Sequence, residues 1–117
     1  MKKLLIMLIV STGLFSVAQA STTSASYDTV KLISIGSTGN LYIYMTGSEI
    51  DPADCENTDP APSINRYTLE ADSPIYKLVY AQVLTAMAAG FELKLAIEDQ
   101  GCLEGSGIVA RSAARPS

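Results

Sequence analysis

The sequence predicts a mainly β domain of the α+β class, with one helix inserted among short strands. Three observations lead to this prediction: short runs in which apolar and polar residues alternate, turn-forming residues between the runs, and one stretch with helical spacing. The expected order is strand, strand, strand, helix, strand, strand. This is the element order of a five-stranded OB-like barrel. The alternative is an open antiparallel sheet with the helix packed on one face.

The first two strands are expected to form a hairpin. Residues 27–35 are rich in β-branched side chains, and residues 36–40 form a turn cluster with two glycines. Residues 41–46 then alternate cleanly between two faces. Leu41, Ile43 and Met45 lie on one face, and Tyr42, Tyr44 and Thr46 lie on the other. If the aliphatic set faces the core, the second set faces outward.

The helix is expected after a third strand at residues 64–69. Ser73 is a suitable N-cap, Pro74 suits the first helical position, and Gly90 suits a left-handed C-cap. Apolar residues between them follow helical spacing and cover a broad surface, so the helix is expected to be mostly buried or to line an interface. The last two strands are expected at residues 91–97 and 108–113, with a turn at 99–102 and a glycine-rich hinge at 104–107.

The first twenty residues have the pattern of a secretory signal peptide. Lys2 and Lys3 precede an apolar run, and small residues precede an expected cleavage between Ala20 and Ser21. We therefore expect a signal peptide at 1–20, a flexible lead at 21–26, one domain at 27–113 and a tail at 114–117. The mature protein is expected in the periplasm or secreted, and not in a membrane.

The chain has two cysteines, Cys55 and Cys102, and no histidine. In an oxidising compartment this pair predicts one disulfide, and two thiols without histidine do not make a zinc site. We expect no cofactor and no metal. The residues Glu49, Asp51, Asp54, Glu56 and Asp59 form an acidic loop that could offer oxygen ligands to calcium, but the spacing of a calcium loop is absent. A solvated charged surface is the simpler interpretation.

Charge and composition exclude some classes of function. Without Lys2 and Lys3 the mature chain carries six basic and twelve acidic residues, a net charge of −6. This balance disfavours nucleic acid as a partner, because phosphate backbones would be repelled. The absence of histidine and of a free thiol argues against an enzyme. A weaker option is a hydrolase that uses the carboxylates of Glu98, Asp99 and Glu104.

The candidate ligand-binding residues are Tyr42, Tyr44 and Thr46. Outward tyrosine rings could stack on a sugar or contact a partner protein. Alternatively, they cover a neighbouring strand or form a subunit contact. Tyr76 and Tyr80 on the helix are expected to pack rather than to bind.

The helix and the cysteines carry a resemblance to known proteins. The segments concerned are Tyr76-Lys77-Leu78-Val79-Tyr80, Leu84-Thr85-Ala86-Met87-Ala88-Ala89-Gly90, Cys102 and Cys55. With these, the chain resembles a group of small exported proteins of Gram-negative bacteria whose functions are mostly unknown. Its element order is also similar to the pentamer-forming OB-fold binding subunits of bacterial A–B toxins. That similarity implies an exported, disulfide-containing protein that recognises glycans and assembles into rings.

The sequence therefore predicts a small exported, non-enzymatic module that binds a glycan or a protein. The alternative is a structural protomer of a homo-oligomeric, ring-like assembly. In that case the helix surface around Tyr80, Leu84 and Met87 is the expected contact.

Overall fold

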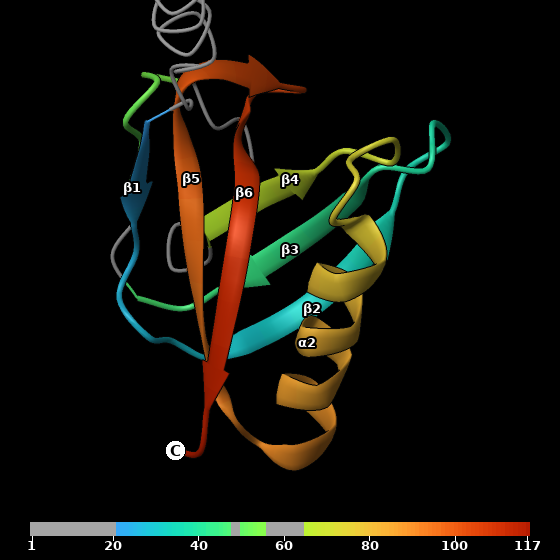
Figure 1. The fold of residues 1–117 in the computed structure, drawn as a ribbon, viewed down its shortest axis with the longest axis vertical. Helices are drawn as coiled ribbons and strands as arrows, with labels where there is room; N and C mark the ends of the chain where they lie inside the picture. Colours follow the sequence, from blue (N-terminus) through green and yellow to red (C-terminus); the bar gives the residue numbers. More distant parts are fainter. Residues whose placement is uncertain (1–20, 48–49, 56–64) are drawn as a thin grey trace, which may run out of the picture.

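The computed structural model of the chain describes residues 21–47, 50–55 and 65–117. The predicted signal peptide, with Ala20, and the acidic residues Glu49, Glu56 and Asp59 lie outside these ranges. The described part is mainly β with one helix, so the predicted class is confirmed (Figure 1). In chain order the elements are β1 Thr22–Ser24, β2 Val30–Ile35, β3 Leu41–Met45, β4 Asn65–Leu69, α2 Tyr76–Ala89, β5 Glu92–Leu103 and β6 Ser106–Arg115.

The strands form one six-stranded mixed sheet in the order β1-β5-β6-β4-β3-β2. Neighbours are antiparallel except β4 and β6, which are parallel. The closed five-stranded barrel predicted from the element order is not formed, and the open-sheet alternative describes the structure better. The reason is β1: it pairs with β5 at Thr22↔Glu98 and so takes the edge that β2 would need for closure. The chain just before β2 contacts β5 through an isolated bridge, Asp28↔Leu93, and a hydrogen bond from the Ala25 N–H to the Leu95 carbonyl.

Both ends of the domain contain strand residues that the sequence does not predict. The expected flexible lead contains β1, where Thr23 donates a hydrogen bond to the carboxylate of Asp99 at 2.6 Å. At the other end β6 continues to Arg115, two residues into the expected tail. Neither segment has a strong apolar pattern, and both are strands because backbone groups of β5 are available beside them.

The β5–β6 hairpin is longer than predicted. Residues 99–102 were expected to turn the chain, but β5 runs through them to Leu103 with register shifts between Ile97 and Cys102. The reversal takes place instead at Glu104 and Gly105, both of which have positive φ. Gly107 follows in β6, where a Cβ would lie 2.7 Å from Cγ2 of Ile97, so only glycine fits without displacing that side chain.

Helix α2 begins at Tyr76, later than Ser73 and Pro74 predict. Ile75 is at the N-cap position and makes no side-chain capping bond; Ser73 Oγ accepts a bond from the Ile75 N–H at 3.3 Å. The C-terminal prediction is confirmed, because Gly90 adopts the left-handed conformation with φ 72° and its N–H donates to the Ala86 carbonyl. No described helix is both long enough and apolar enough to cross a membrane.

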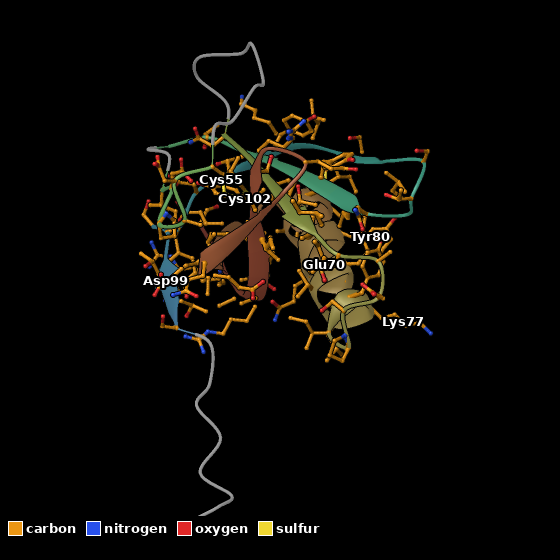
Figure 2. The ribbon with its side chains drawn as sticks, turned by 90° about the horizontal axis from the view of Figure 1, so that it is seen from above. Cys55, Glu70, Lys77, Tyr80, Asp99 and Cys102 are labelled. Carbon is orange, nitrogen blue, oxygen red and sulfur yellow. A yellow bond between two sulfur atoms is a disulfide. The ribbon has the colours of Figure 1, made fainter. Side chains whose placement is uncertain are left out.

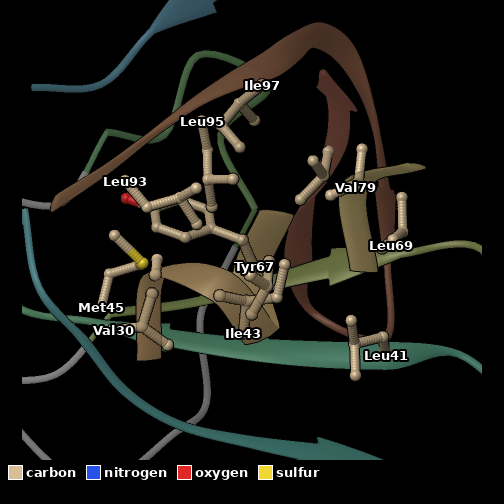
Figure 3. Packing of buried hydrophobic residues seen from close by; sticks show 13 residues of the cluster. Val30, Leu41, Ile43, Met45, Tyr67, Leu69, Val79, Leu93, Leu95 and Ile97 are labelled. Carbon is tan, nitrogen blue, oxygen red and sulfur yellow. The ribbon is translucent and has the colours of Figure 1, made fainter. Parts of the chain in front are cut away.

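The core lies between α2 and one face of the sheet (Figure 3). The helix contributes Val79, Val83 and Ala86, whereas Leu78 is 71% exposed, so its buried stripe is narrower than predicted. The sheet contributes alternate residues, as the period of two requires. Its buried members are Val30, Leu41, Ile43, Met45, Tyr67, Leu69, Leu93, Leu95, Ile97 and Val109.

The predicted disulfide between Cys55 and Cys102 is confirmed (Figure 2). It joins the segment 50–55 to the distal half of the β5–β6 hairpin. The Cys55 N–H also donates to the carboxylate of Asp51 at 2.6 Å. Cys55 is buried and Cys102 is exposed. The disulfide therefore fastens the segment 50–55 to the β5–β6 hairpin.

Candidate functional site

The outward face of β3 has the composition that the alternation predicts. Leu41, Ile43 and Met45 are buried, while Tyr42 and Tyr44 are partly exposed on the opposite face. The antiparallel register with β4 places Tyr44 opposite Arg66 and Tyr42 opposite Thr68. We call Tyr42, Tyr44 and Arg66 the tyrosine–arginine surface.

The tip of the β5–β6 hairpin folds over this outer face of β4. Arg66 donates from Nε to Ser106 Oγ at 2.6 Å and from Nη2 to the Glu104 carbonyl at 2.5 Å. Thr68, one pleat further along, is fully buried beneath the hairpin and its hydroxyl contacts the Leu103 carbonyl at 3.5 Å. Arg66 therefore has a structural role: it holds the hairpin tip against the sheet.

Tyr42 also holds the tip of the β5–β6 hairpin against the sheet. Its hydroxyl donates a hydrogen bond to the carboxylate of Glu104. The guanidinium carbon of Arg66 lies 5.3 Å from the centre of the Tyr42 ring, which is within cation–π range. The ring and the guanidinium thus hold each other in one orientation, and little conformational freedom remains to be lost when a ligand docks there.

Two groups on the tyrosine–arginine surface keep unused binding capacity. The Tyr44 hydroxyl makes no hydrogen bond within the described part of the chain, where the Arg66 guanidinium likewise lacks an ion pair with a carboxylate. Tyr44 can offer a ring face and a hydroxyl, and Arg66 can offer charge and its remaining N–H donors. Together they suit a polar ligand that has an apolar face.

Thr46, the third predicted ligand residue, lies on the same face but is engaged elsewhere. Its hydroxyl donates to the Thr29 carbonyl at 3.3 Å and accepts from the Thr29 N–H at 3.2 Å. These two bonds extend the contact between the ends of β2 and β3 by one residue pair. The structure gives Thr46 a role in the hairpin rather than beside Tyr42 and Tyr44.

The three carboxylates considered for a hydrolase do not converge. Glu104 binds Tyr42, and Asp99 binds Thr23 on β1. Hydrogen bonds from Thr23 and Ser21 lower the pKa of Asp99. Glu98, in contrast, lines a cavity of about 380 Å³ together with Glu70. Loss of solvent there raises the pKa of Glu98, and the negative charge of Glu70 raises it further.

Arg66 was not singled out by the sequence. Its position within residues 64–69 predicts an outward side chain, and that was the only local signal. Its partners Ser106 and Glu104 are 40 and 38 residues away in the chain. They meet only because β4 and β6 pair in parallel, a contact that no sequence periodicity reveals.

Metal binding has no geometric support in the part of the chain that is described: no group of three or more acidic or cysteine side chains there is arranged to hold an ion. Comparison of the chain with protein-family models, with curated proteins and with solved structures gives no match.

Proposed function

We propose that the chain is an exported, non-enzymatic binding module whose tyrosine–arginine surface takes a glycan. The observation that carries the proposal is the outward pair Tyr42 and Tyr44 beside Arg66, on one face of β3 and β4. Tyrosine rings can stack on the apolar face of a sugar, while arginine donors and a tyrosine hydroxyl can bind its polar edge. Such a site needs oriented aromatic rings and hydrogen-bond donors, and it needs no catalytic base.

A proposed relationship to the OB-fold agrees with this location of the binding site. We propose that strands β2 to β6 and α2 form a partly open relative of the OB-fold, with β1 as an added edge strand. Its support is the element order, the parallel pairing of β4 with β6 and the bridge Asp28↔Leu93. OB-folds bind oligosaccharides on the face of their second and third strands, beside the loop between strands four and five. Those elements correspond to β3, β4 and the hairpin tip at Glu104.

A glycan array with the purified mature chain is the first test, followed by titration of the glycans that bind. Tyr44→Ala should weaken binding about tenfold or more, as loss of a central aromatic contact does. Tyr80→Ala, which removes a tyrosine from the helix instead, is the matched control and should bind like the wild type. Full affinity in the double variant Tyr42→Ala/Tyr44→Ala would exclude this surface as the binding site.

Export is part of the proposal and can be tested separately. It is supported by the pattern of the first twenty residues and is compatible with the Cys55–Cys102 disulfide. Mass spectrometry of the protein recovered from bacterial periplasm and medium should find Ser21 at the amino terminus. A chain that retains residues 1–20 and stays in the cytoplasm would contradict it.

A second candidate function is that of a protomer in a homo-oligomer. Its specific support is exposed apolar surface: Leu84 and Met87 on α2 are 45% and 41% exposed, and Ile35, which pairs with the core residue Leu41 and so lies on the helix side of β2, is 57% exposed. β2 is an edge of the sheet, and α2 packs beside it (Figure 1). An apolar edge strand next to an apolar helix flank suits a contact with another copy.

Light scattering of the mature protein tests this second candidate. A ring-like assembly should give a mass that is a multiple of the chain mass, and Ile35→Lys together with Leu84→Lys should reduce it to a single chain. Leu78→Lys, at a helix position that is also exposed but lines a hollow beside Arg111 and Ser112 of β6, is the control. A wild-type mass of one chain at high concentration would refute the assembly without affecting the glycan proposal.

A further inference from the structure

Strands β1, β5 and β6 run side by side at one edge of the sheet (Figure 1). A small hollow lies on these strands, and Lys94 and Arg111 are among the residues that line it. The register places Lys94 opposite Ala113 and Arg111 opposite Ala96. The two cations are therefore diagonal neighbours on one face of the sheet, with Cα atoms expected about 7–8 Å apart. Alanine stands opposite each of them, so no bulky side chain fills the space between.

The resulting cavity has a volume of about 160 Å³. The residues that line it are Ser24, Lys94, Ala96, Arg111, Ser112 and Ala113. Ser24 comes from β1, where it pairs with Ala96, and its exposed hydroxyl can donate a hydrogen bond into the space. The Ser112 hydroxyl is already bonded to Gln82 of α2. No carboxylate is among the lining residues.

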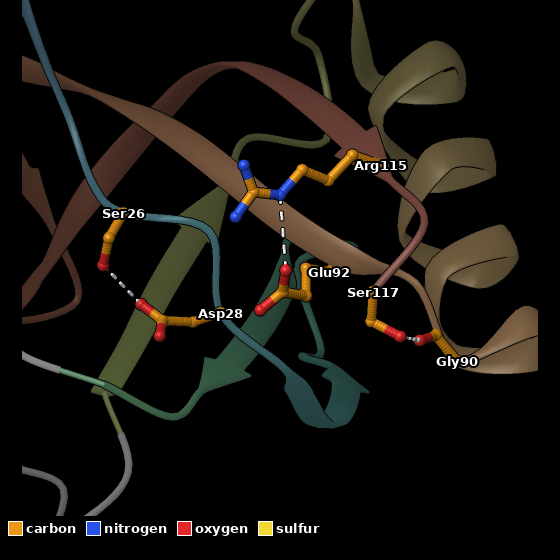
Figure 4. Close-up of polar contacts among 6 residues, drawn as sticks. All are labelled: Ser26, Asp28, Gly90, Glu92, Arg115 and Ser117. Atoms are coloured by element: carbon orange, nitrogen blue, oxygen red, sulfur yellow. Dashed lines mark hydrogen bonds and ion pairs between the residues drawn. The ribbon is translucent and has the colours of Figure 1, made fainter.

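The charges at this hollow are not neutralised by the surrounding protein. Nearby Arg115 forms an ion pair with Glu92 at 3.3 Å (Figure 4). Lys94 and Arg111, in contrast, have no acidic partner in the described ranges 21–47, 50–55 and 65–117. Lys94 Nζ is 5.1 Å from the centre of the Tyr27 ring, which restrains the side chain without cancelling its charge. Lys94 and Arg111 thus present two positive charges on one face of the sheet, with no carboxylate among the residues that line the hollow.

We propose that this hollow binds one tetrahedral oxyanion group, such as a phosphate or a sulfate. The planar guanidinium of Arg111 can donate two parallel hydrogen bonds to such a group. The Lys94 ammonium adds a second positive charge. The volume of about 160 Å³ has room for one oxyanion group. The mature chain has a net charge of −6, so its overall field repels anions and this site has to act through local contacts. The proposal is independent of the tyrosine–arginine surface, with which it shares no residue.

The test is a titration of the folded mature chain with inorganic phosphate and with inorganic sulfate, followed by amide NMR. Saturable shifts at Ser24, Lys94 and Ala113 are expected. Lys94→Gln and Arg111→Gln should each weaken binding about tenfold or more, because each removes a charge-assisted hydrogen bond. Lys77→Gln, which removes the same charge from α2, is the matched control and should change the affinity less than twofold.

A second variant separates a shaped site from a simple concentration of charge. Ala113→Val keeps both cations but fills the hollow, and valine suits a strand position. It should abolish the saturable shifts while the rest of the spectrum shows a native fold. Shifts that never saturate, an equal effect of Lys77→Gln, or unchanged affinity in Ala113→Val would each overturn the proposal.

Two further probes identify the source of the oxyanion. Methyl phosphate tests a monoester at the end of a larger molecule, and vesicles containing phosphatidylglycerol test a phosphate diester in a lipid surface. Binding of inorganic phosphate alone indicates a free anion, whereas equal binding of methyl phosphate indicates an ester-bearing ligand. Either result supports the proposal. Binding to the vesicles without any binding of phosphate, sulfate or methyl phosphate would overturn it.

Discussion

The Cys55–Cys102 disulfide should account for a large part of the stability of this domain. The two cysteines are 47 residues apart in the chain. On the chain-entropy model, a cross-link that closes a loop of this length lowers the entropy of the unfolded chain enough to stabilise the fold by about 4 kcal/mol. For a domain of roughly 100 residues, each kcal/mol shifts the melting temperature by about 5 °C. Removal of the disulfide should therefore lower it by about 20 °C.

Urea unfolding followed by far-UV circular dichroism measures this effect in two ways. Reduction of the wild type leaves both sulfur atoms in place, whereas Cys55→Ala/Cys102→Ala also removes a buried sulfur at Cys55. The double variant should thus lose slightly more free energy of unfolding than the reduced protein, and the difference reports on the packing of Cys55. The slope with urea should increase in both, because the unfolded chain is no longer constrained.

A loss of less than about 1 kcal/mol in both forms would refute the entropic account of the disulfide. Such a result would mean that the unfolded chain already keeps Cys55 and Cys102 close together. Binding of a glycan to the reduced protein is a useful companion measurement. Because the disulfide fastens the hairpin whose tip contacts Arg66, reduction is expected to weaken the proposed site as well as the fold.

Three further predictions concern packing and charge. Gly107→Ala should destabilise the protein by about 1–3 kcal/mol in urea unfolding, because its Cβ would lie 2.7 Å from Cγ2 of the buried Ile97. Val83→Ala should cost about 2 kcal/mol in the same assay, since Val83 is fully buried, while Leu78→Ala on the same helix should cost less than about 0.5 kcal/mol. Glu98→Gln should raise the melting temperature at pH 7 but not at pH 3. The pKa of Glu98 is raised in the folded state, so wild-type stability falls as pH rises through that value, and a neutral glutamine avoids the loss.

Each of these predictions has a contradicting result. Equal losses in Val83→Ala and Leu78→Ala would mean that the helix does not bury the stripe formed by Val79, Val83 and Ala86. A neutral effect of Gly107→Ala would mean that β5 and β6 can separate locally at no cost. A stabilisation by Glu98→Gln that is the same at pH 3 and pH 7 would show that ionisation of Glu98 is not its cause.

Features that depend on a residue and its near neighbours were predictable. The alternation of Leu41 to Thr46 follows from the two-residue period of a strand, and this period alone places Tyr42 and Tyr44 on a shared outward face. Gly90 ends the helix as predicted, because the left-handed conformation at this position requires only the conformational freedom of glycine itself. The predicted start of the helix, at Ser73 and Pro74, was less accurate, because α2 begins at Tyr76. Ser73 lies two residues before the N-cap residue Ile75 and accepts a bond from the Ile75 N–H, so it does not cap an N–H of the first helical turn.

Features that depend on which strands pair were not predictable. A weakly patterned segment such as Thr22–Ser24 becomes a strand because β5 has an unpaired edge, and this same pairing prevents closure of the barrel. The hydrogen bond from Arg66 to the Glu104 carbonyl likewise exists only in the folded sheet. The same holds for the diagonal placement of Lys94 and Arg111 on β5 and β6.

From the sequence alone came the class of the fold, the orientation of the β3 side chains and the identity of the two linked cysteines. These depend on backbone periodicity, on local turn chemistry and on there being a single possible pair. The tertiary structure alone decided the sheet order, the covering of Thr68 by the hairpin and the groups that meet at each candidate site. Those contacts join residues tens of positions apart, and the register that aligns them is selected by the packing of the whole core.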